Sequence, residues 1–283
     1  MLKRGMRLSA LAVTIALSLT LPTACGAEDP DWRTIDPENL LVIETGKGRI
    51  IVEMRPDLAP LAVARIKELT RAGTFDGLQF HRVIDGFVAQ TGNPGNKDGG
   101  KSALPNLAPE FTAKIAPASG YVPISTRSDG STGFLGTLPV ETVSAAEDAR
   151  RGEGTTQTWG AYCPGVVGMG RDDAFDSANS EFFFMRGSAR RLDRLYTAWG
   201  MTVEGLEIVY KLNTGEPPAA PDVMTRVRIA ADIPSGERPT VEAMRPASVD
   251  FLSYVGAIRG QKRADFSICD LRVGTRIDGK DNP

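Results

Sequence analysis

The sequence contains few of the side chains that build metal centres and redox sites. It has one histidine, His81, and three cysteines, no two of which are separated by only two residues. Because zinc and iron sites usually need several such ligands, the sequence predicts neither a metal site nor a cofactor. The lone histidine has no suitable partners for a Ser-His-Asp triad, so we expect it to play a structural role.

The chain also lacks an excess of positive charge. Its 33 lysines and arginines are outnumbered by 35 aspartates and glutamates, which gives a formal net charge of −2. We therefore expect no nucleic-acid partner. Glycine pairs such as Gly99-Gly100 fit turns, but they lack the strand-to-helix setting of a phosphate-binding loop. With no repeats, 283 residues suit one large domain with an extension or two small domains.

The N-terminus has the pattern of an export signal. Basic residues are followed by an apolar run over residues 8–21, which is shorter than the ~20 residues of an ordinary membrane span. We therefore expect the protein in the periplasm or cell envelope. The basic residues are Lys3, Arg4 and Arg7.

Two cleavage sites are compatible with this signal. Cleavage after Gly26 or Ala27 would remove residues 1–27 as a signal peptide and release a soluble protein. Alternatively, Thr23-Ala24-Cys25 resembles a lipoprotein box, in which the signal ends before a lipidated Cys25 that anchors the protein to a membrane surface. Pro22 argues against this second interpretation, because such a box prefers an aliphatic residue there.

Two further cysteines, Cys163 and Cys269, remain after the signal. In an oxidising compartment an even pair is a candidate disulfide, which would join the C-terminal tail to the main domain. Two buried free thiols are the alternative.

The elements expected along the chain are mostly short strands. Residues 28–39 are polar and are predicted to be a linker, and two strands (40–44 and 49–54) follow around a glycine turn. A helix is predicted from Asp57 and Pro60 to Ala72. The further predicted strands are 78–84, 87–91, 121–125, 133–136, 165–169, 181–185, 197–202 and 226–233, and a second helix is predicted at 203–212.

Many short strands with two helices fit a mainly β fold, namely a closed eight-stranded antiparallel barrel capped by two helices, over residues 40–233. Residues 110–160 are predicted to be an insertion, whose polar part (141–158) we expect to be mobile. Residues 234–283 are predicted to be an extension packed on the barrel, with a helical pattern broken by Pro246 and a short strand at 266–269.

One short segment, residues 80–93, carries the strongest functional signal. It places Arg82, Phe87 and Gln90 on two strands joined by a glycine turn, which would bring them onto one surface. A fixed guanidinium beside an apolar ring and an amide suits a carbonyl and a prolyl ring. The pattern F-H-R-x-I-x-G-F-x-x-Q-x-G resembles the signature of the cyclophilin family of peptidyl-prolyl cis-trans isomerases, whose fold is an eight-stranded barrel with two helices.

The resemblance implies roles for the residues of this segment. Arg82 matches the catalytic arginine that donates to the prolyl nitrogen, and Phe87 matches a wall of the proline pocket. Gln90 matches the glutamine that positions the arginine and the substrate. Val88 stands where the family usually has methionine, and His81 matches a scaffold position beside the site.

Two more segments resemble the family with changes that add charge. In residues 165–171, Met169 matches, while Gly170 and Arg171 replace an alanine and an asparagine whose backbone contacts the peptide. In residues 177–184, Phe183 matches the pocket floor, but Glu181 replaces a glutamine. A carboxylate cannot donate as an amide does, so pairing with Arg82 or Arg171 is expected instead.

The last segment, residues 191–200, completes the expected site. Leu192 matches the pocket, and Tyr196 replaces a histidine while keeping a ring that can pack on proline. Arg191 occupies a tryptophan position, a change that predicts weak binding of the cyclic inhibitor cyclosporin.

These observations favour an exported, monomeric prolyl isomerase that acts on X-Pro bonds of exported proteins and assists their folding in the cell envelope. Its partners would be proline-containing polypeptides. Because Glu181, Arg171 and Arg191 add charge where the family is neutral, the alternative is a catalytically weak peptide-binding or chaperone module. A structural envelope protein is a third possibility, and it predicts that the surface around Arg82 is not concave.

Overall fold

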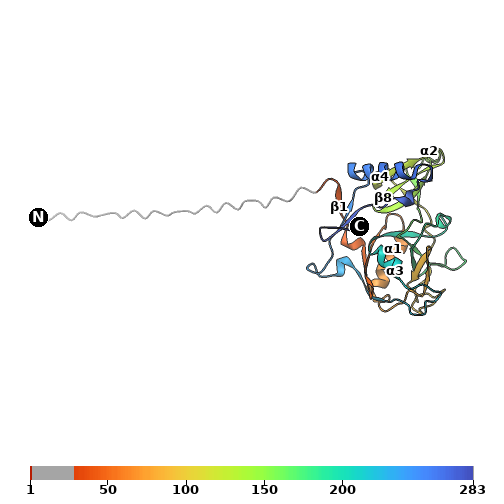
Figure 1. Cartoon of the computed structure of the whole chain (residues 1–283), viewed down its shortest axis with the longest axis vertical. Helices are drawn as coiled ribbons and strands as arrows, with labels where there is room; N and C mark the ends of the chain where they lie inside the picture. Colours follow the sequence, from red (N-terminus) through yellow and green to blue (C-terminus); the bar gives the residue numbers. More distant parts are fainter. Residues whose placement is uncertain (2–28, 283) are drawn as a thin grey trace.

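The structure is a computed structural model that describes Met1 and residues 29–282. The predicted signal, with Cys25 and both cleavage sites, lies outside the described residues. The largest unit of the described chain, which Figure 1 shows as a whole, is a sheet of eight antiparallel strands. Their order is β14-β2-β3-β13-β11-β12-β5-β4. The strands are β2 (Leu40–Thr45), β3 (Gly48–Met54), β4 (Arg82–Ile84), β5 (Val88–Thr91), β11 (Val166–Met169), β12 (Phe182–Met185), β13 (Ala198–Glu204) and β14 (Met224–Ile229).

The prediction of a closed barrel is not confirmed. β4 and β14 are the two end strands of the curled sheet and do not pair with each other. The predicted strand over residues 78–84 is regular only at Arg82–Ile84, and two isolated bridges, Gln79–Val223 and Val83–Gly215, lie near the gap. The fold is therefore mainly β, as predicted, with a half-barrel in place of a closed one.

Both faces of this sheet are covered, which explains the continuous apolar run of β2. Leu41 and Ile43 belong to the inner core, while Leu40 and Val42 belong to a second core on the outer face. A strand buried on one face alternates apolar and polar residues, whereas a strand buried on both faces does not. The apolar run of β2 thus reflects a second layer of structure outside the sheet.

Two helices pack on the inner core. α1 (Pro60–Arg71) begins with a proline at its first turn, and the carboxylate of Glu110 accepts hydrogen bonds from the N–H groups of Leu61 and Ala62, both at 2.8 Å. α3 (Leu206–Lys211) is shorter than predicted, because Val203 belongs to β13 and Gly205, with φ +81°, separates that strand from the helix.

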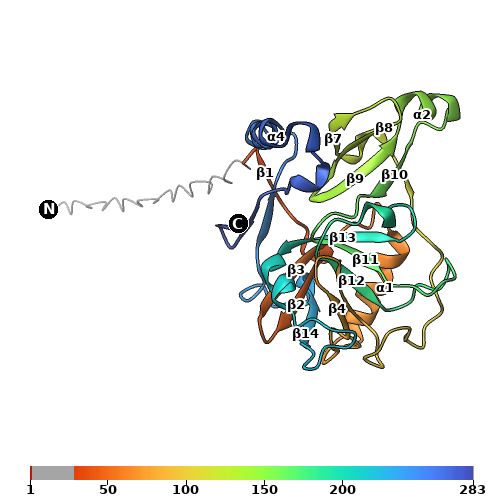
Figure 2. The same cartoon turned by 45° about the vertical axis from the view of Figure 1, so that its right-hand side comes forward.

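The prediction that residues 141–158 form a mobile insertion is wrong, because these residues fold as part of a second sheet. Five strands in the order β6-β10-β9-β8-β7, together with α2 (Ala145–Arg151), lie above the outer face of the large sheet (Figure 2). Polar residues in this part have partners: Glu141 pairs with Arg127 and Arg190, and Ser144 caps α2. The strands are β6 (Ala113–Ile115), β7 (Tyr121–Thr126), β8 (Gly130–Leu135), β9 (Leu138–Val143) and β10 (Thr156–Gly160).

The predicted linker over residues 28–39 is wrong for its described part, residues 29–39. β1 (Trp32–Thr34) pairs with β15 (Val241–Met244) of the extension, in a sheet completed by β16 (Thr275–Ile277) and β17 (Lys280–Asn282). The side chains of Trp32 and Ile35 are buried there. The two ends of the described chain are thus joined by strand pairing.

The extension also contains a helix on the far side of Pro246. α4 (Val249–Lys262) is capped by Ser248, and its Phe251 packs edge-to-face on Phe134 of β8, with ring centroids 5.4 Å apart. The predicted strand at 266–269 is wrong, because Ser267 and Asp270 form a capping box that favours a 3-10 turn, Ile268–Asp270. Among the described residues, no helix combines the length and apolar character needed to cross a bilayer.

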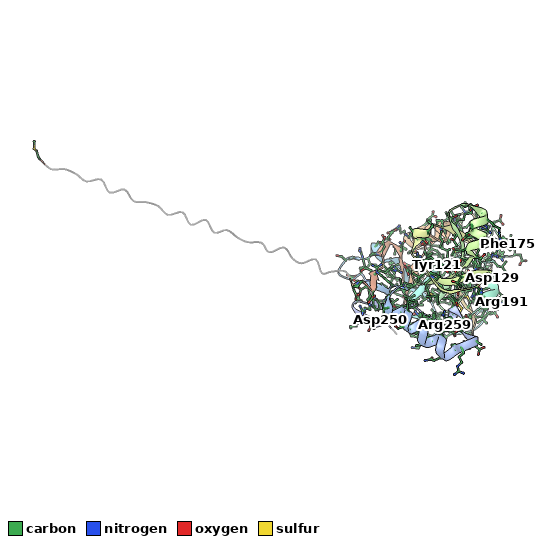
Figure 3. The ribbon with its side chains drawn as sticks, turned by 90° about the horizontal axis from the view of Figure 1, so that it is seen from above. Tyr121, Asp129, Phe175, Arg191, Asp250 and Arg259 are labelled. Atoms are coloured by element: carbon green, nitrogen blue, oxygen red, sulfur yellow. A yellow bond between two sulfur atoms is a disulfide. The ribbon has the colours of Figure 1, made fainter. Side chains whose placement is uncertain are left out.

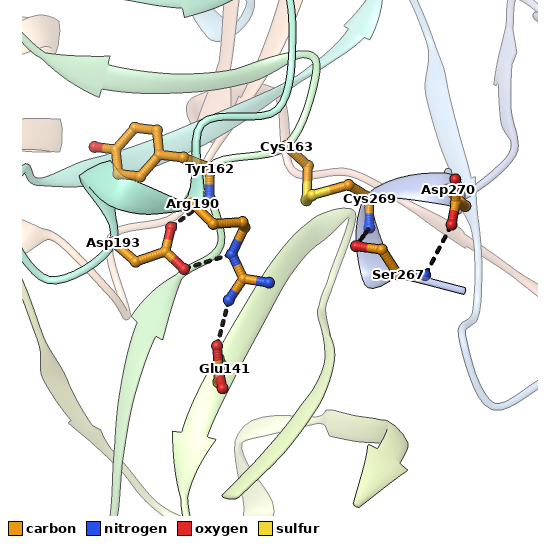
Figure 4. The surroundings of a disulfide bond; sticks show 8 residues. All are labelled: Glu141, Tyr162, Cys163, Arg190, Asp193, Ser267, Cys269 and Asp270. Atoms are coloured by element: carbon orange, nitrogen blue, oxygen red, sulfur yellow. Dashed lines mark hydrogen bonds and ion pairs between the residues drawn. A yellow bond between two sulfur atoms is a disulfide. The ribbon is translucent and has the colours of Figure 1, made fainter. Parts of the chain in front are cut away.

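A disulfide joins Cys163, just after β10, to Cys269 in this 3-10 turn (Figure 4). The two cysteines are 106 residues apart in the sequence. The bond therefore connects the region between the two large sheets to the C-terminal extension.

A buried carboxylate ties the N-terminal strand to both large sheets. Glu53 on β3 accepts hydrogen bonds from Arg33 of β1 at 2.7 and 2.9 Å, from Arg55, and from the hydroxyl of Thr137. Burial alone would raise the pKa of Glu53, but Arg33 and Arg55 outweigh it and hold the pKa below its usual value.

Candidate active site

A pocket of about 230 Å³ opens on the outer face of the large sheet. The surface around Arg82 is therefore concave. A purely structural envelope protein was expected to have no concave surface there, so this third possibility is not supported. Nine of the eleven residues expected to form the site line the pocket, and Asp98 joins them without having been anticipated. The lining residues are Arg82, Phe87, Val88, Gln90, Asp98, Gly170, Arg171, Phe183, Leu192 and Tyr196.

The other two expected residues lie elsewhere. Met169 is 1% exposed and packs in the inner core, on the opposite face of the sheet from the pocket. Glu181 lies behind Gln90, whose amide donates to its carboxylate at 2.9 Å, and its backbone oxygen accepts from the N–H of the lining residue Gly170 at 2.8 Å.

Strand register brings the central residues together. Arg82 on β4 is paired with Gln90 on β5, and Gln90 is in turn paired with Phe183 on β12. Residues paired across antiparallel strands project on the same face, so the guanidinium, the amide and the aromatic ring lie side by side. The tight turn between β4 and β5 uses Gly86 with φ +63°, a conformation that favours glycine.

The apolar part of the pocket is built from aromatic rings. The ring of Phe183 contacts Tyr196 edge-to-face at 5.9 Å between centroids and stacks at 5.8 Å on Tyr162, which is fully buried. Tyr162 supports the floor from below, and no motif in the sequence pointed to it. Phe87 and Leu192 complete a cavity suited to a small apolar ring.

Arg82 is held by two side chains. Its Nε donates to Glu216 at 2.7 Å, and its Nη1 donates to the side-chain oxygen of Gln90 at 3.3 Å. A guanidinium has five N–H donors, so three are left for a ligand in the pocket. Glu216 lies on the loop before β14, and sequence reasoning did not identify it.

Glu181 does not form the expected ion pair with Arg82 or Arg171. It accepts hydrogen bonds from the amides of Gln90 at 2.9 Å and Asn93 at 2.8 Å, and from the N–H of Gly100 at 3.2 Å. Burial raises the pKa of Glu181 to about 7, and the nearby carboxylate of Asp98 adds to the rise.

Arg171 stacks on aromatic rings at the rim. Its guanidinium carbon lies 4.3 Å from the ring centre of Tyr196 and 5.0 Å from that of Phe175, and it donates to backbone oxygens of Asp172 and Leu195. Its charge is therefore placed beside the pocket, over Tyr196, and not across the pocket opening.

We expect the substitution Glu181→Gln to stabilise the protein at alkaline pH. The folded protein keeps the Glu181 proton up to a pKa of about 7, while the unfolded chain releases it near the ordinary value of 4.5. The contribution of Glu181 to wild-type stability therefore falls as the pH rises from 4.5 through 7, and it is lost above pH 7. The variant should be more stable by up to about 3 kcal/mol at pH 8 and nearly equal at pH 5.

Denaturant unfolding at both pH values in metal-free buffer measures this difference. Glu207→Gln, which removes an exposed carboxylate on α3, is the matched control and should show no such pH dependence. A difference between Glu181→Gln and wild type that is the same at pH 5 and pH 8 would contradict the expectation.

Arg191 lies over the wall of the pocket. Its guanidinium carbon is 4.7 Å from the ring centre of Phe87, and Figure 3 shows Arg191 at the edge of the molecule where Phe175 also lies. A charged group at this rim must lose water when a large apolar ligand covers it.

We expect Arg191→Trp to strengthen the binding of cyclosporin by at least tenfold relative to wild type. An indole offers apolar surface and an N–H donor at the same rim without a charge to desolvate. Titration calorimetry measures the affinities, with Arg150→Trp on the exposed side of α2 as the control. Equal affinities for wild type and Arg191→Trp would show that Arg191 does not limit binding.

The site thus combines an arginine and a glutamine with an aromatic floor on a curled antiparallel sheet. Residues 40–231 match the model of the family described as cyclophilin type peptidyl-prolyl cis-trans isomerase/CLD. The chain therefore belongs to the cyclophilin family of peptidyl-prolyl cis-trans isomerases, as the motif predicted.

Individual relatives agree with this assignment. The chain is 32% identical over 231 residues to a probable peptidyl-prolyl cis-trans isomerase of Brucella suis biovar 1, covering 79% of this chain and 95% of the relative. Peptidyl-prolyl cis-trans isomerase B of Bacillus subtilis is 29% identical over 189 residues, covering 66% and 94% of the two chains.

A solved structure resembles most of the fold. The crystal structure of cyclophilin AquaCyp293 from Hirschia baltica matches with a TM-score of 0.79 and 33% identity, over 87% of this chain and 93% of that chain. This share is larger than the part matched by the family model, so the likeness includes residues outside 40–231.

Proposed function

We propose that this protein catalyses cis-trans isomerisation of X-Pro bonds in exported proteins and thereby assists their folding in the cell envelope. The observation that carries the proposal is the register that places Arg82, Gln90 and Phe183 side by side in one pocket. Proline-containing polypeptides would be the substrates, and the protein would act as a monomer.

The chemistry needs no nucleophile, since no covalent bond is broken. The barrier of ~20 kcal/mol arises because the C–N bond loses its amide resonance as it rotates. A catalyst must therefore bind the twisted amide more tightly than either planar form.

The pocket offers the groups that this requires. The rings of Phe87 and Phe183 would hold the prolyl ring, while a free donor of Arg82 would reach the prolyl nitrogen, whose lone pair localises in the twisted state. Gln90 and Glu216 hold the guanidinium before the substrate arrives, so little reorganisation is needed during the reaction.

Isomerisation of a short X-Pro peptide by the mature chain, taken as residues 28–283, tests the proposal. Catalysis is expected well above the uncatalysed rate. A folded sample with no catalysis above background would overturn the enzymatic proposal and favour a peptide-binding module.

One observation favours this second candidate. The amide of Gln90 donates to two carboxylates, Asp98 and Glu181, both at 2.9 Å, which draws it away from a substrate. If the natural site is attenuated, Glu181→Gln should raise the turnover of the same peptide severalfold, whereas an equal or lower turnover would argue for full activity in the wild type.

Two features support the proposed location in the cell envelope. The N-terminal pattern is that of an export signal, and a disulfide between Cys163 and Cys269 suits an oxidising compartment. Fractionation of cells expressing the full chain and a Cys25→Ser variant tests this: loss of membrane association in the variant would indicate lipidation, whereas a periplasmic wild type would indicate ordinary cleavage.

A further inference from the structure

The imidazole ring of His81 has no hydrogen-bond partner among the described residues. Its side chain is 0% exposed, and both Nδ1 and Nε2 lack a partner, although Nε2 lies 3.7 Å from a carboxylate oxygen of Glu181. Buried polar atoms are normally hydrogen-bonded, so an imidazole of this kind needs an explanation. In its neutral form an imidazole has one nitrogen with a free lone pair, which can bind a metal ion.

Two carboxylates face this ring. One ligand atom from each of His81, Asp98 and Glu181 lies within 4.8 Å of the others. The three residues come from separate segments: His81 precedes β4, Asp98 lies in the loop after β5, and Glu181 precedes β12. Sequence reasoning missed this group because the only histidine was judged without knowledge of which acids the fold places beside it.

The group is short of positive charge. The partners of Glu181 are neutral donors, namely Gln90, Asn93 and the N–H of Gly100, and Asp98 shares the amide of Gln90 with it. The two carboxylates share this one amide donor and have oxygens within 4.8 Å of each other, so they repel each other when both are charged. A bound cation would remove this repulsion.

An entry path to the group is open. A cavity of about 260 Å³ is lined by His81 and Asp98, and Asp98 itself is exposed. Arg82 and Lys97 line the same cavity and oppose a cation, but Arg82 is already paired with Glu216 at 2.7 Å.

The donor set selects the kind of ion. One imidazole nitrogen with two carboxylate oxygens suits zinc and similar divalent transition metals, whereas magnesium and calcium prefer oxygen ligands alone. Ligand atoms around zinc stand about 3.3 Å apart, so the exposed loop carrying Asp98 would have to move slightly inward. We propose that His81, Asp98 and Glu181 bind a divalent transition-metal ion beside Arg82, leaving the remaining coordination positions to water.

If the protein is the proposed isomerase, an ion bound at this site would affect catalysis. A metal that draws Asp98 and Glu181 toward itself takes both acceptors away from the amide of Gln90. Gln90 is also the partner of Arg82, so the ion would change how the guanidinium is held. Zinc should therefore change the isomerase rate of the wild type.

Binding is tested directly with zinc and the mature chain, without a histidine tag and after treatment with a chelator. Because His81 is the only histidine and Cys163 and Cys269 are bonded, no other imidazole and no free thiol competes for the metal. Titration calorimetry should show one zinc ion per chain, and the single imidazole signal in a ¹⁵N-histidine NMR spectrum should shift as zinc is added. A folded protein with neither result would overturn the proposal.

Two conservative variants test the ligands. Asp98→Asn and Glu181→Gln should each weaken zinc binding by at least tenfold, since each replaces a carboxylate ligand with an amide. Glu207→Gln, which removes an exposed carboxylate on α3, should leave the affinity within twofold. Equal zinc affinities for wild type, Asp98→Asn and Glu181→Gln would show that the ion binds elsewhere and would overturn the assignment.

These readouts separate the two proposals. Zinc binding without isomerase activity would support the metal site and contradict the proposed function. Isomerase activity without zinc binding would support the proposed function and contradict the metal site.

Discussion

Replacing Arg82 by alanine is expected to lower kcat/KM for X-Pro isomerisation by about 100- to 1,000-fold, the usual cost of removing one donor to a developing charge. The substitution removes the guanidinium that lies beside Gln90 in the lining of the pocket. Because this donor acts on the twisted amide, the loss should appear mainly in kcat and only slightly in KM.

Two further variants make this result specific. Arg82→Lys keeps the charge but loses the planar fork that contacts Gln90 and Glu216 together, so an intermediate loss of about tenfold or more is expected. Arg150→Ala, which removes an exposed arginine on α2, should leave the rate unchanged. If Arg82→Ala keeps more than half of the wild-type rate while folded, Arg82 is not the catalytic donor.

The stability of Arg82→Ala should be close to that of the wild type. The ion pair that it removes joins side chains that are 26% and 55% exposed, and surface pairs of this kind contribute about 1 kcal/mol or less. A thermal unfolding curve therefore separates a lost donor from a lost fold.

The site was predictable to the extent that strand register determines it. Arg82, Phe87 and Gln90 lie on one hairpin, so a short motif specifies their relation, and the family resemblance extends this to Phe183 and Tyr196. Glu216, Asp98 and Tyr162 carry no such local signal. Glu216 reaches Arg82 across a sequence separation of 134 residues, Asp98 reaches Gln90 from the irregular loop eight residues later, and Tyr162 stacks on Phe183 from another segment.

The errors in the fold have the same physical origin. Residues 141–158 look like a loop because their polar groups are numerous, but Glu141 finds its partner Arg190 in a distant segment. Residues 28–39 look like a linker because they are polar and contain two prolines. Their strand β1 forms only because it pairs with β15, which lies more than 200 residues later. Local patterns cannot show such partners, which decide whether a polar or short segment folds.

Removing the disulfide should produce the largest loss of stability. Cross-linking residues 106 positions apart restricts the unfolded chain, and the chain-entropy account gives about 4 to 5 kcal/mol for a loop of this length. The double variant Cys163→Ala/Cys269→Ala should therefore unfold at markedly lower guanidinium concentration. A reducing agent should bring the wild type to the same midpoint and leave the variant unchanged, whereas equal midpoints for oxidised wild type and variant would contradict the account.

The same double variant also tests whether the disulfide bond supports the pocket. Cys163 follows Tyr162, whose ring lies under Phe183, but the N–H of Tyr162 is held independently by Asp193 at 2.9 Å, and Arg190 fixes that carboxylate (Figure 4). We therefore expect the double variant to keep at least half of the wild-type kcat/KM at 25 °C while it is folded. A loss of activity without unfolding would instead show that the floor of the pocket depends on the bond to the extension, and that oxidation of the two cysteines is needed for an active site.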